Sequence, residues 1–158
     1  MKTVTNIIDH ILKVIIVVIM IAISILGIYQ VVTRYFLGNA STWSEEMIRF
    51  LFIWASCLGG AVGIKEKIHI GIDVVVGVLP NKVRKITDIL VYLLIITFGV
   101  FLTIYGFKLS QQTMSQVSPA LGVSMGIVYL ALPALGILSI YYSLLELISL
   151  IKSKEGVE

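Results

Sequence analysis

Two carboxylates and a guanidinium, on Glu45, Glu46 and Arg49, stand close together at the start of a long hydrophobic stretch. In a helix, Arg49 follows Glu45 by four residues and Glu46 by three, so it can pair with either carboxylate. An unpaired charge costs about 2.5–3.5 kcal/mol at the centre of a membrane helix, and less near its ends. The carboxylates could also relay protons or bind a cation. The start of a helix by itself favours acidic residues, so the structural role is preferred.

Other residue types that serve catalysis or metal binding are scattered along the chain. His10 and His69 lie in different segments, Cys57 is the one cysteine, and the sequence has no phosphate-binding glycine loop. His69 and Asp73 could pair on one helical face, but two ligands are too few for a metal site. The sequence therefore predicts no enzyme, no metal and no other cofactor.

The elements that position these side chains are membrane spans. The chain has 158 residues, of which 58% are hydrophobic and 13% charged, and its mean hydropathy is +1.03. Too few polar groups remain to coat a globule of this size, and several apolar runs are long enough to cross a bilayer. We predict an all-α integral membrane protein, a single membrane domain over residues 1–158. Its four transmembrane helices are expected at 13–36, 44–64, 86–108 and 121–151.

The ends of the first two spans carry signals of the membrane interface. Arg34 and Tyr35 close the first span, and Trp43 opens the second, where headgroups favour such side chains. Thr42 and Glu45 have the spacing of a capping box. Ahead of the first span, Ile7, Ile8, Ile11 and Leu12 are expected on one side of a helix, with Lys2 and Asp9 at the water.

Small residues recur along the second span. Ala55, Gly59 and Gly63 repeat every four residues, and Ser56 and Gly60 form a parallel row. In lipid, where packing drives helix association, such a face lets two backbones approach closely. The spacing leaves open whether the partner helix belongs to this chain or to another.

Residues 68–79 form an amphipathic segment that is too short to span a membrane as a helix. In a helix its apolar residues share one face, and His69 and Asp73 lie on the opposite face. Alternating isoleucines also fit a strand, but an unpaired strand edge beside lipid leaves backbone groups without partners. We therefore favour a short helix in the membrane plane.

The last span shows a start signal and an interruption. Ser118 and Pro119 suit the cap and first turn of a helix, and Pro133 is expected to kink it.

Basic residues predict the orientation. With four spans, one side holds every lysine and arginine except Arg34, Arg49 and Lys108. The positive-inside rule places this side, with both termini and the amphipathic segment, in the cytoplasm. The net charge of +3 needs no nucleic acid to explain it, and the basic loop can contact membrane lipids.

Several short motifs, taken in order, resemble one family. They are Arg34-Tyr35, Asn39, Trp43-x-Glu45-Glu46-x-x-Arg49, Trp54, Gly59-Gly60-Ala61, His69-Ile70 and Leu79-Pro80. Over about residues 10–150 the chain is similar to the small membrane subunit of tripartite ATP-independent periplasmic (TRAP) transporters, the DctQ-like family. Each motif is loose by itself, and their order carries the resemblance.

The resemblance implies a partner subunit rather than a catalytic centre. Such systems take up carboxylate solutes, such as C4-dicarboxylates, sialic acids or other organic acids, across the bacterial inner membrane. A periplasmic DctP-like binding protein delivers the solute, and a large DctM-like subunit carries the sodium and substrate sites. The small subunit would brace that large subunit, and sodium coupling is expected there rather than in this chain.

Two other functions stay open. A self-standing oligomeric carrier would use Glu45 or Glu46 and would transport solute without partners. A non-transporting assembly module would have no large permease partner. Against the first alternative, the sequence shows no inverted repeat and no matching pair of glycine- or proline-broken spans.

Overall fold

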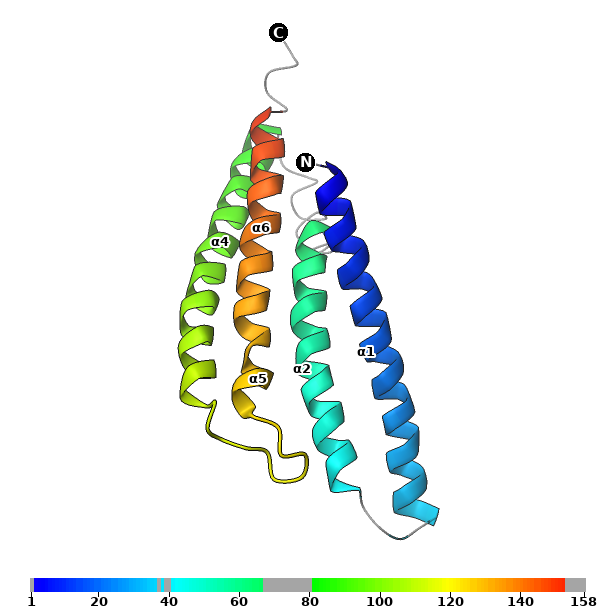
Figure 1. Cartoon of the computed structure of the whole chain (residues 1–158). Coiled ribbons are helices and arrows are strands. Elements are labelled where there is room, and N and C mark those ends of the chain that lie inside the picture. The colour runs from blue at the N-terminus through cyan, green and yellow to red at the C-terminus, as the bar shows by residue number, and fades with distance from the viewer. Residues whose placement is uncertain (1, 37, 39–40, 67–80, 153–158) are drawn as a thin grey trace.

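The chain folds into long helices. The computed structural model describes residues 2–36, 38, 41–66 and 81–152 (Figure 1). Within these residues there is no strand, and one isolated bridge joins Val117 to Ser124. The helices are α1 (Lys2–Phe36), α2 (Thr42–Lys65), α4 (Asn81–Gln112), α5 (Met125–Tyr129) and α6 (Ala131–Lys152). The predicted all-α class is confirmed.

In the described part of the chain, four stretches are long and apolar enough to cross a membrane, as expected of a multi-pass membrane protein. They are Thr5–Phe36, Thr42–Lys65, Ile86–Gln112 and Met125–Leu150. The amphipathic segment 68–79, with His69 and Asp73, lies outside the described residues, so its helix stays a prediction.

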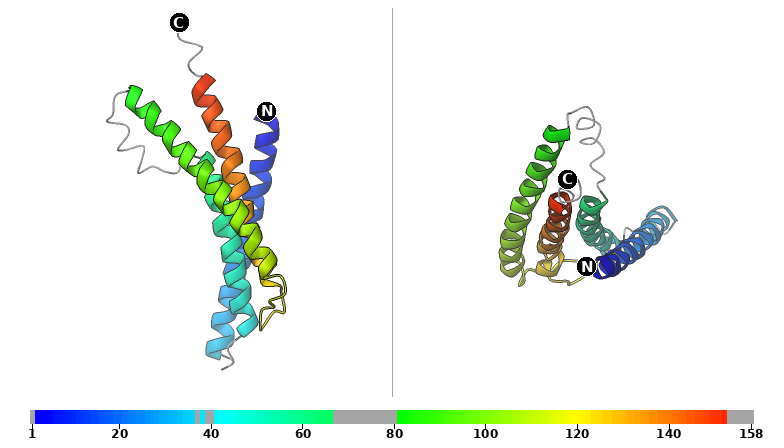
Figure 2. Two further views of the ribbon diagram at one scale, coloured as in Figure 1. Left: turned by 90° about the vertical axis from the view of Figure 1, so that its left-hand side faces the viewer. Right: turned by 90° about the horizontal axis from the view of Figure 1, so that it is seen from above.

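The long helices form one curved layer in the order α4, α6, α2, α1 (Figure 2). The start of α1 and the end of α6 lie at the same end of the molecule, where α2 ends and α4 begins (Figure 1). We call this the terminal end, and the opposite end, which carries the turns after α1 and α4, the loop end.

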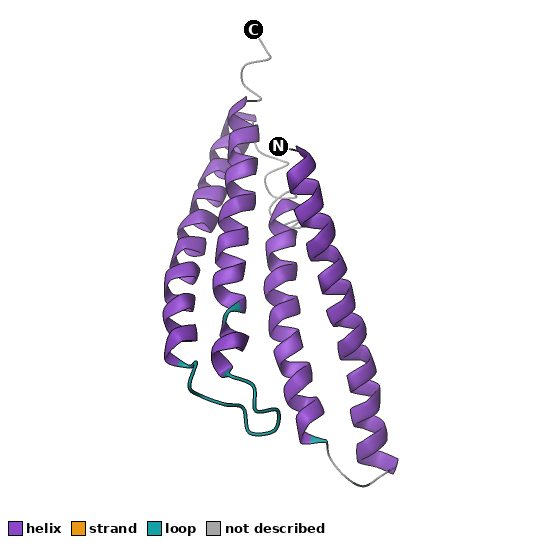
Figure 3. Cartoon of the chain, in the orientation of Figure 1, coloured by secondary structure: helices purple, strands orange, loops and turns teal. Residues whose placement is uncertain are grey.

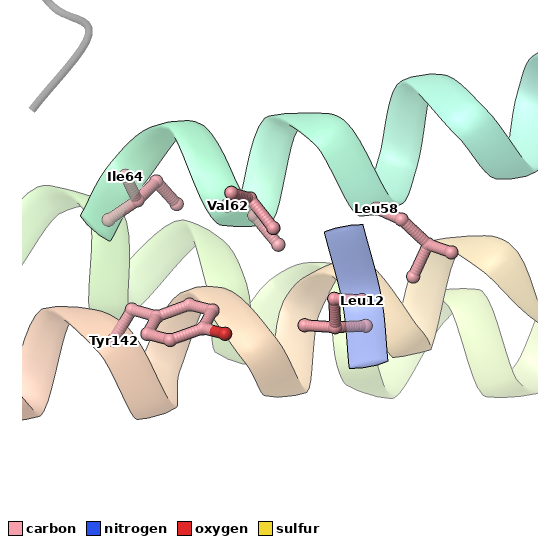
Figure 4. Packing of buried hydrophobic residues seen from close by; sticks show 6 residues of the cluster. Leu12, Leu58, Val62, Ile64 and Tyr142 are labelled. Carbon is pink, nitrogen blue, oxygen red and sulfur yellow. The ribbon is translucent and has the colours of Figure 1, made fainter. Parts of the chain in front are cut away.

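The apolar core lies where α1, α2 and α6 meet. Its buried members include Leu12 from α1, Leu58 and Val62 from α2, and Tyr142 from α6 (Figure 4). Ala61, which is fully buried, lets the neighbouring helices come close to α2. Close packing of these side chains holds the three helices together.

Helices α4 and α6 make the closest contact in the layer, through glycines. A β-carbon added to Gly136 would lie 2.6 Å from the carbonyl oxygen of Gly99, and one added to Gly106 would lie 2.8 Å from the Pro133 ring. Larger residues at these positions would push the helices apart. Small residues therefore let α4 and α6 approach closely, which is the role that the sequence suggested for the small residues of the second span.

The start of α2 differs from the predicted capping box. Ser41 is the residue before the helix, and its side chain makes no capping hydrogen bond. Thr42 is already helical, so Glu45 stands one position too far along to reach back to a cap, and it pairs with Arg49 instead. The capping-box prediction is wrong.

Predictions for the last span are partly wrong. Ser118 and Pro119 do not start a helix: they lie in a loop, and α5 starts at Met125 after Ser124 (Figure 3). The break falls at Leu130, three residues before Pro133. A proline ring clashes with the carbonyl four residues earlier, here that of Tyr129, and the proline offers that carbonyl no N–H, so the helix is interrupted as expected.

Candidate functional site

Glu45, Glu46 and Arg49 of α2 line a hollow at the loop end. The hollow, of about 370 Å³, lies between the start of α2 and the turn that follows α4. Its lining residues are Thr42, Glu45, Glu46, Arg49, Pro119 and Ala120. The structure thus brings the sequence-predicted carboxylates and arginine together with a loop more than 70 residues away, which the sequence did not indicate.

Glu46 holds the loop. Its carboxylate accepts hydrogen bonds from the backbone N–H of Ala120, at 3.2 and 3.3 Å to its two oxygens, and from that of Leu121, at 3.1 Å. Hydrogen bonds to an ionised acceptor are stronger than those between neutral groups. The turn is thereby fastened to α2.

Local bonds shape the loop so that these two N–H groups are free to bind Glu46. Ser118 donates its N–H to the Val123 carbonyl at 2.9 Å, and its hydroxyl accepts from the Val123 N–H at 3.3 Å. Gly122 bonds back to the Ser118 carbonyl at 3.0 Å and has a φ of +68°, a backbone conformation that glycine adopts at no steric cost. The result is a tight turn over residues 118–122.

Arg49 pairs with Glu45 and not with Glu46. Its Nη2 lies 3.2 Å from Glu45 Oε1, and about 60% of each side chain remains exposed, 64% for Arg49 and 59% for Glu45. The two carboxylates therefore differ: Glu46 is engaged with backbone, and Glu45 forms an exposed ion pair. Among the described residues, no three His, Cys, Asp or Glu side chains gather as a metal site.

The interfacial side chains of α1 and α2 lie at the loop end of the layer. The Trp43 ring contacts that of Tyr29 from α1, with centroids 5.5 Å apart. Arg34 and Tyr35 are exposed at the end of α1. The loop end of the layer thus carries aromatic and cationic groups where α1 and α2 meet the expected interface.

The small residues of α2 have different surroundings. Ala55 is buried, Gly63 is half-buried, and a β-carbon added to Gly59 would meet nothing within 4 Å. One added to Gly60 would touch Leu135 of α6 at 3.7 Å. In the described part of the chain, Gly59 therefore faces open space rather than a neighbouring helix.

The structure forms a cluster of polar side chains at the terminal end that the sequence did not predict. Asp9, expected at the water, is only 6% exposed, while Ile7 and Ile11 are about half exposed. Asp9 pairs with Lys65 and accepts a hydrogen bond of 2.6 Å from the Tyr142 hydroxyl. Three helices contribute to the cluster, so no single stretch of sequence reveals it.

Two further contacts flank the cluster on the same side of α1. The hydroxyls of Thr5 and Tyr141 lie 3.1 Å apart, and Lys13 pairs with Glu66. Thr5, Asp9 and Lys13 are spaced by four residues, which places them on one helical face. That spacing was the available signal for a polar row facing other helices.

The family model for the DctQ component of tripartite ATP-independent periplasmic transporters matches residues 23–153. The chain belongs to this DctQ family. A similar protein of matching length is the sialic acid TRAP transporter small permease protein SiaQ of Vibrio cholerae, 28% identical over 158 residues, covering 99% of this chain and 91% of SiaQ.

Other relatives of this DctQ chain are much longer. The sialic acid TRAP transporter permease protein SiaT of Haemophilus influenzae is 30% identical over 75% of the chain, which spans 20% of SiaT. The isethionate TRAP transporter permease protein DctMQ of Oleidesulfovibrio alaskensis is 35% identical over 72% of the chain, which spans 19% of DctMQ. The DctQ chain thus corresponds to about a fifth of these permeases.

Proposed function

We propose that this chain is the small permease subunit of a TRAP transporter and braces a large DctM-like membrane subunit. The observation that carries the proposal is its similarity to about a fifth of single-chain TRAP permeases. A segment fused to a permease in some proteins, and separate in others, suits a dedicated subunit of that permease. The described residues also offer rigid helices and an uncovered face rather than a catalytic centre.

The transport reaction we propose is sodium-driven uptake of carboxylate solutes delivered by a periplasmic DctP-like binding protein. Relatives are named for sialic acid and for C4-dicarboxylates. The solute is chosen by the other two components, and sodium binds the large subunit, so this chain needs no cofactor of its own.

The partner face we propose lies on α2 around Gly59. At each glycine of the α4–α6 contact, atoms of the neighbouring helix occupy the space that a β-carbon would take. Beside Gly59 that space is open. Phe52, two turns earlier on the same face, is 61% exposed, and the Arg49–Glu45 pair continues that face toward the loop end. A helix of the large subunit would pack on Gly59 and Gly63, and Ala55 would support this face from within the bundle.

We propose that the protein resides in the bacterial inner membrane with both termini in the cytoplasm. The terminal end would then face the cytoplasm and the Glu46-held turn the periplasm. Cysteines introduced in a Cys57→Ala background test this. In intact cells, an impermeant maleimide should label Ala120→Cys and should not label Lys13→Cys until the membrane is opened; the reverse pattern would contradict the orientation.

Co-purification and transport test the bracing function. The tagged chain is expressed with and without its genomic neighbours, and both complex formation and solute uptake in proteoliposomes are measured. We expect a stoichiometric complex, and sodium-dependent uptake only when all three components are present. Uptake by the chain alone would instead favour the self-standing carrier, and the absence of any large partner would favour an assembly module.

A further inference from the structure

We propose that the cluster of the buried Asp9 and Tyr142 with the partly exposed Lys65 fixes the rotation and register of α1 against α2 and α6. The inference concerns the chain's own folding and does not depend on the proposed transport function. It gives a structural role to charged groups, which are otherwise unfavourable in a membrane helix.

Apolar packing by itself directs α1 weakly. From Val14 to Ile28 the one polar side chain is that of Ser24, and its hydroxyl bonds the Met20 carbonyl of the same helix. Only 6% of the most apolar window of α1 is buried, against 33% for α2 and 39% for the last span. The apolar contacts of α1 with the core come from Leu12 and the partly buried Ile8, Ile16 and Ile19. Lipid tails are as apolar as isoleucine and valine, so no hydrophobic driving force adds to this packing.

The polar contacts of the cluster depend on the rotation of α1, whereas the contacts of its apolar face with lipid do not. Asp9 and Tyr142 are 6% and 1% exposed, and the hydroxyl–carboxylate distance is 2.6 Å. A helix has 3.6 residues per turn, so turning α1 by one residue rotates it about 100° and removes the carboxylate from both partners. That rotation would leave the buried Tyr142 hydroxyl without its acceptor, which is costly away from water, and would separate the carboxylate from the Lys65 ammonium, whose side chain is 31% exposed.

The flanking contacts belong to the same row. Thr5 meets Tyr141 of α6 one turn before Asp9, and Lys13 meets Glu66 one turn after it. The register of α1 also decides which of its residues face outward. In this structure Val18, Ile25 and Ile28 face outward, and each is about 60% exposed or more. The cluster therefore sets the surface that α1 presents to lipid or to a partner.

Cross-linking of the full chain in lipid nanodiscs tests the proposal. In a Cys57→Ala background, Tyr141→Cys is combined with Thr5→Cys, which faces it, or with Ile7→Cys, which is 56% exposed in this register. With the cluster intact, a short bis-maleimide should join the first pair at least about fivefold faster than the second, a ratio that corresponds to about 1 kcal/mol. In Asp9→Leu/Lys65→Met/Tyr142→Phe, which leaves no lone buried charge, this ratio should fall below about twofold.

An unchanged ratio in a folded triple variant would overturn the proposal, because apolar packing would then suffice to set the register. Folding is checked by helical content and by thermal unfolding. If the triple variant does not fold, Tyr142→Phe decides the question, since it keeps the ion pair and removes only the hydroxyl. It should lower the ratio at least about twofold; an unchanged ratio there would exclude the Tyr142 hydroxyl from the contacts that set the register and would overturn the proposal for the three-residue cluster.

Discussion

At the scale of single residues, the environment decides what each charge does. Asp9, Glu45 and Glu46 are all carboxylates near helix ends, yet the first is buried against two partners, the second is exposed beside Arg49, and the third binds backbone N–H groups. The same substitution, a carboxylate replaced by its amide, should therefore have different effects at these three positions.

Asp9→Asn should lower the stability of the chain by about 1–3 kcal/mol, because it removes the charge that the Tyr142 hydroxyl and the partly exposed Lys65 ammonium bind at a buried site. Cys57, a buried free thiol and the one cysteine in the chain, reports unfolding to a thiol-reactive dye in detergent. Lys13→Ala is the matched control: its pair with Glu66 is 53% and 41% exposed, so the loss should stay below about 1 kcal/mol. Equal shifts for both variants would contradict the assignment.

Glu46→Gln should loosen the turn over residues 118–122. Loss of the charge weakens the bonds to the N–H groups of Ala120 and Leu121 by about 1.4 kcal/mol, which corresponds to roughly tenfold faster amide exchange there. Hydrogen exchange with mass spectrometry measures it. Glu45→Gln, whose partner is the exposed Arg49, should leave exchange in the turn unchanged; a similar effect from both substitutions would show that Glu46 does not hold the turn specifically.

At the scale of elements, helix pairs in this protein are held by close approach where glycines allow it. The contact of α4 with α6 uses Gly99, Gly106 and Gly136, and the break at Leu130 separates α5 from α6. The α1–α2–α6 contact combines the small Ala61 with larger apolar side chains and with the polar row of α1.

Gly136→Ala should destabilise the α4–α6 contact by about 1–3 kcal/mol, the usual cost of overpacking. The new β-carbon would lie 2.6 Å from the Gly99 carbonyl oxygen and 2.8 Å from the Thr103 nitrogen, both backbone atoms. Gly27→Ala in α1 is the control, because a β-carbon there meets nothing within 4 Å, and it should be neutral or stabilise slightly. Thermal unfolding of both variants in detergent measures the difference; similar melting temperatures would contradict this packing.

At the scale of the whole molecule, the chain is a single layer of helices. Substitutions that affect its stability can therefore be distinguished from substitutions that affect its contacts with a partner. Much of its apolar surface lies outward, as expected of helices that meet lipid or another subunit. A substitution on that surface should affect assembly without affecting the fold.

Arg49→Ala should leave stability within about 0.5 kcal/mol, the value of an exposed pair four residues apart in a helix. Under the proposed function it should lower co-purification with the large subunit, because Glu45 would be left unpaired at the partner face. Lys108→Ala is the control, since Lys108 lies over the Tyr105 ring at 5.4 Å, away from that face. Unchanged complex yield and uptake for Arg49→Ala would remove this pair from the interface.

The sequence alone predicted the membrane class, the number of spans and the family. Hydropathy is a property of each local stretch, and a bilayer requires helices of a fixed minimum length, so neither conclusion needs tertiary contacts. Pro133 likewise interrupts the last span through its own ring and missing N–H. The family motifs are also local, since each is a short string of residues.

Tertiary structure decided which groups meet. Arg49 can reach either glutamate along one helix, and the choice of Glu45 follows from the turn over 118–122, whose N–H groups engage Glu46. Asp9 was expected at the water because its immediate neighbours do not reveal Tyr142, 133 residues further along the chain. Burial and pairing of a charge depend on elements distant in sequence, which local patterns do not encode.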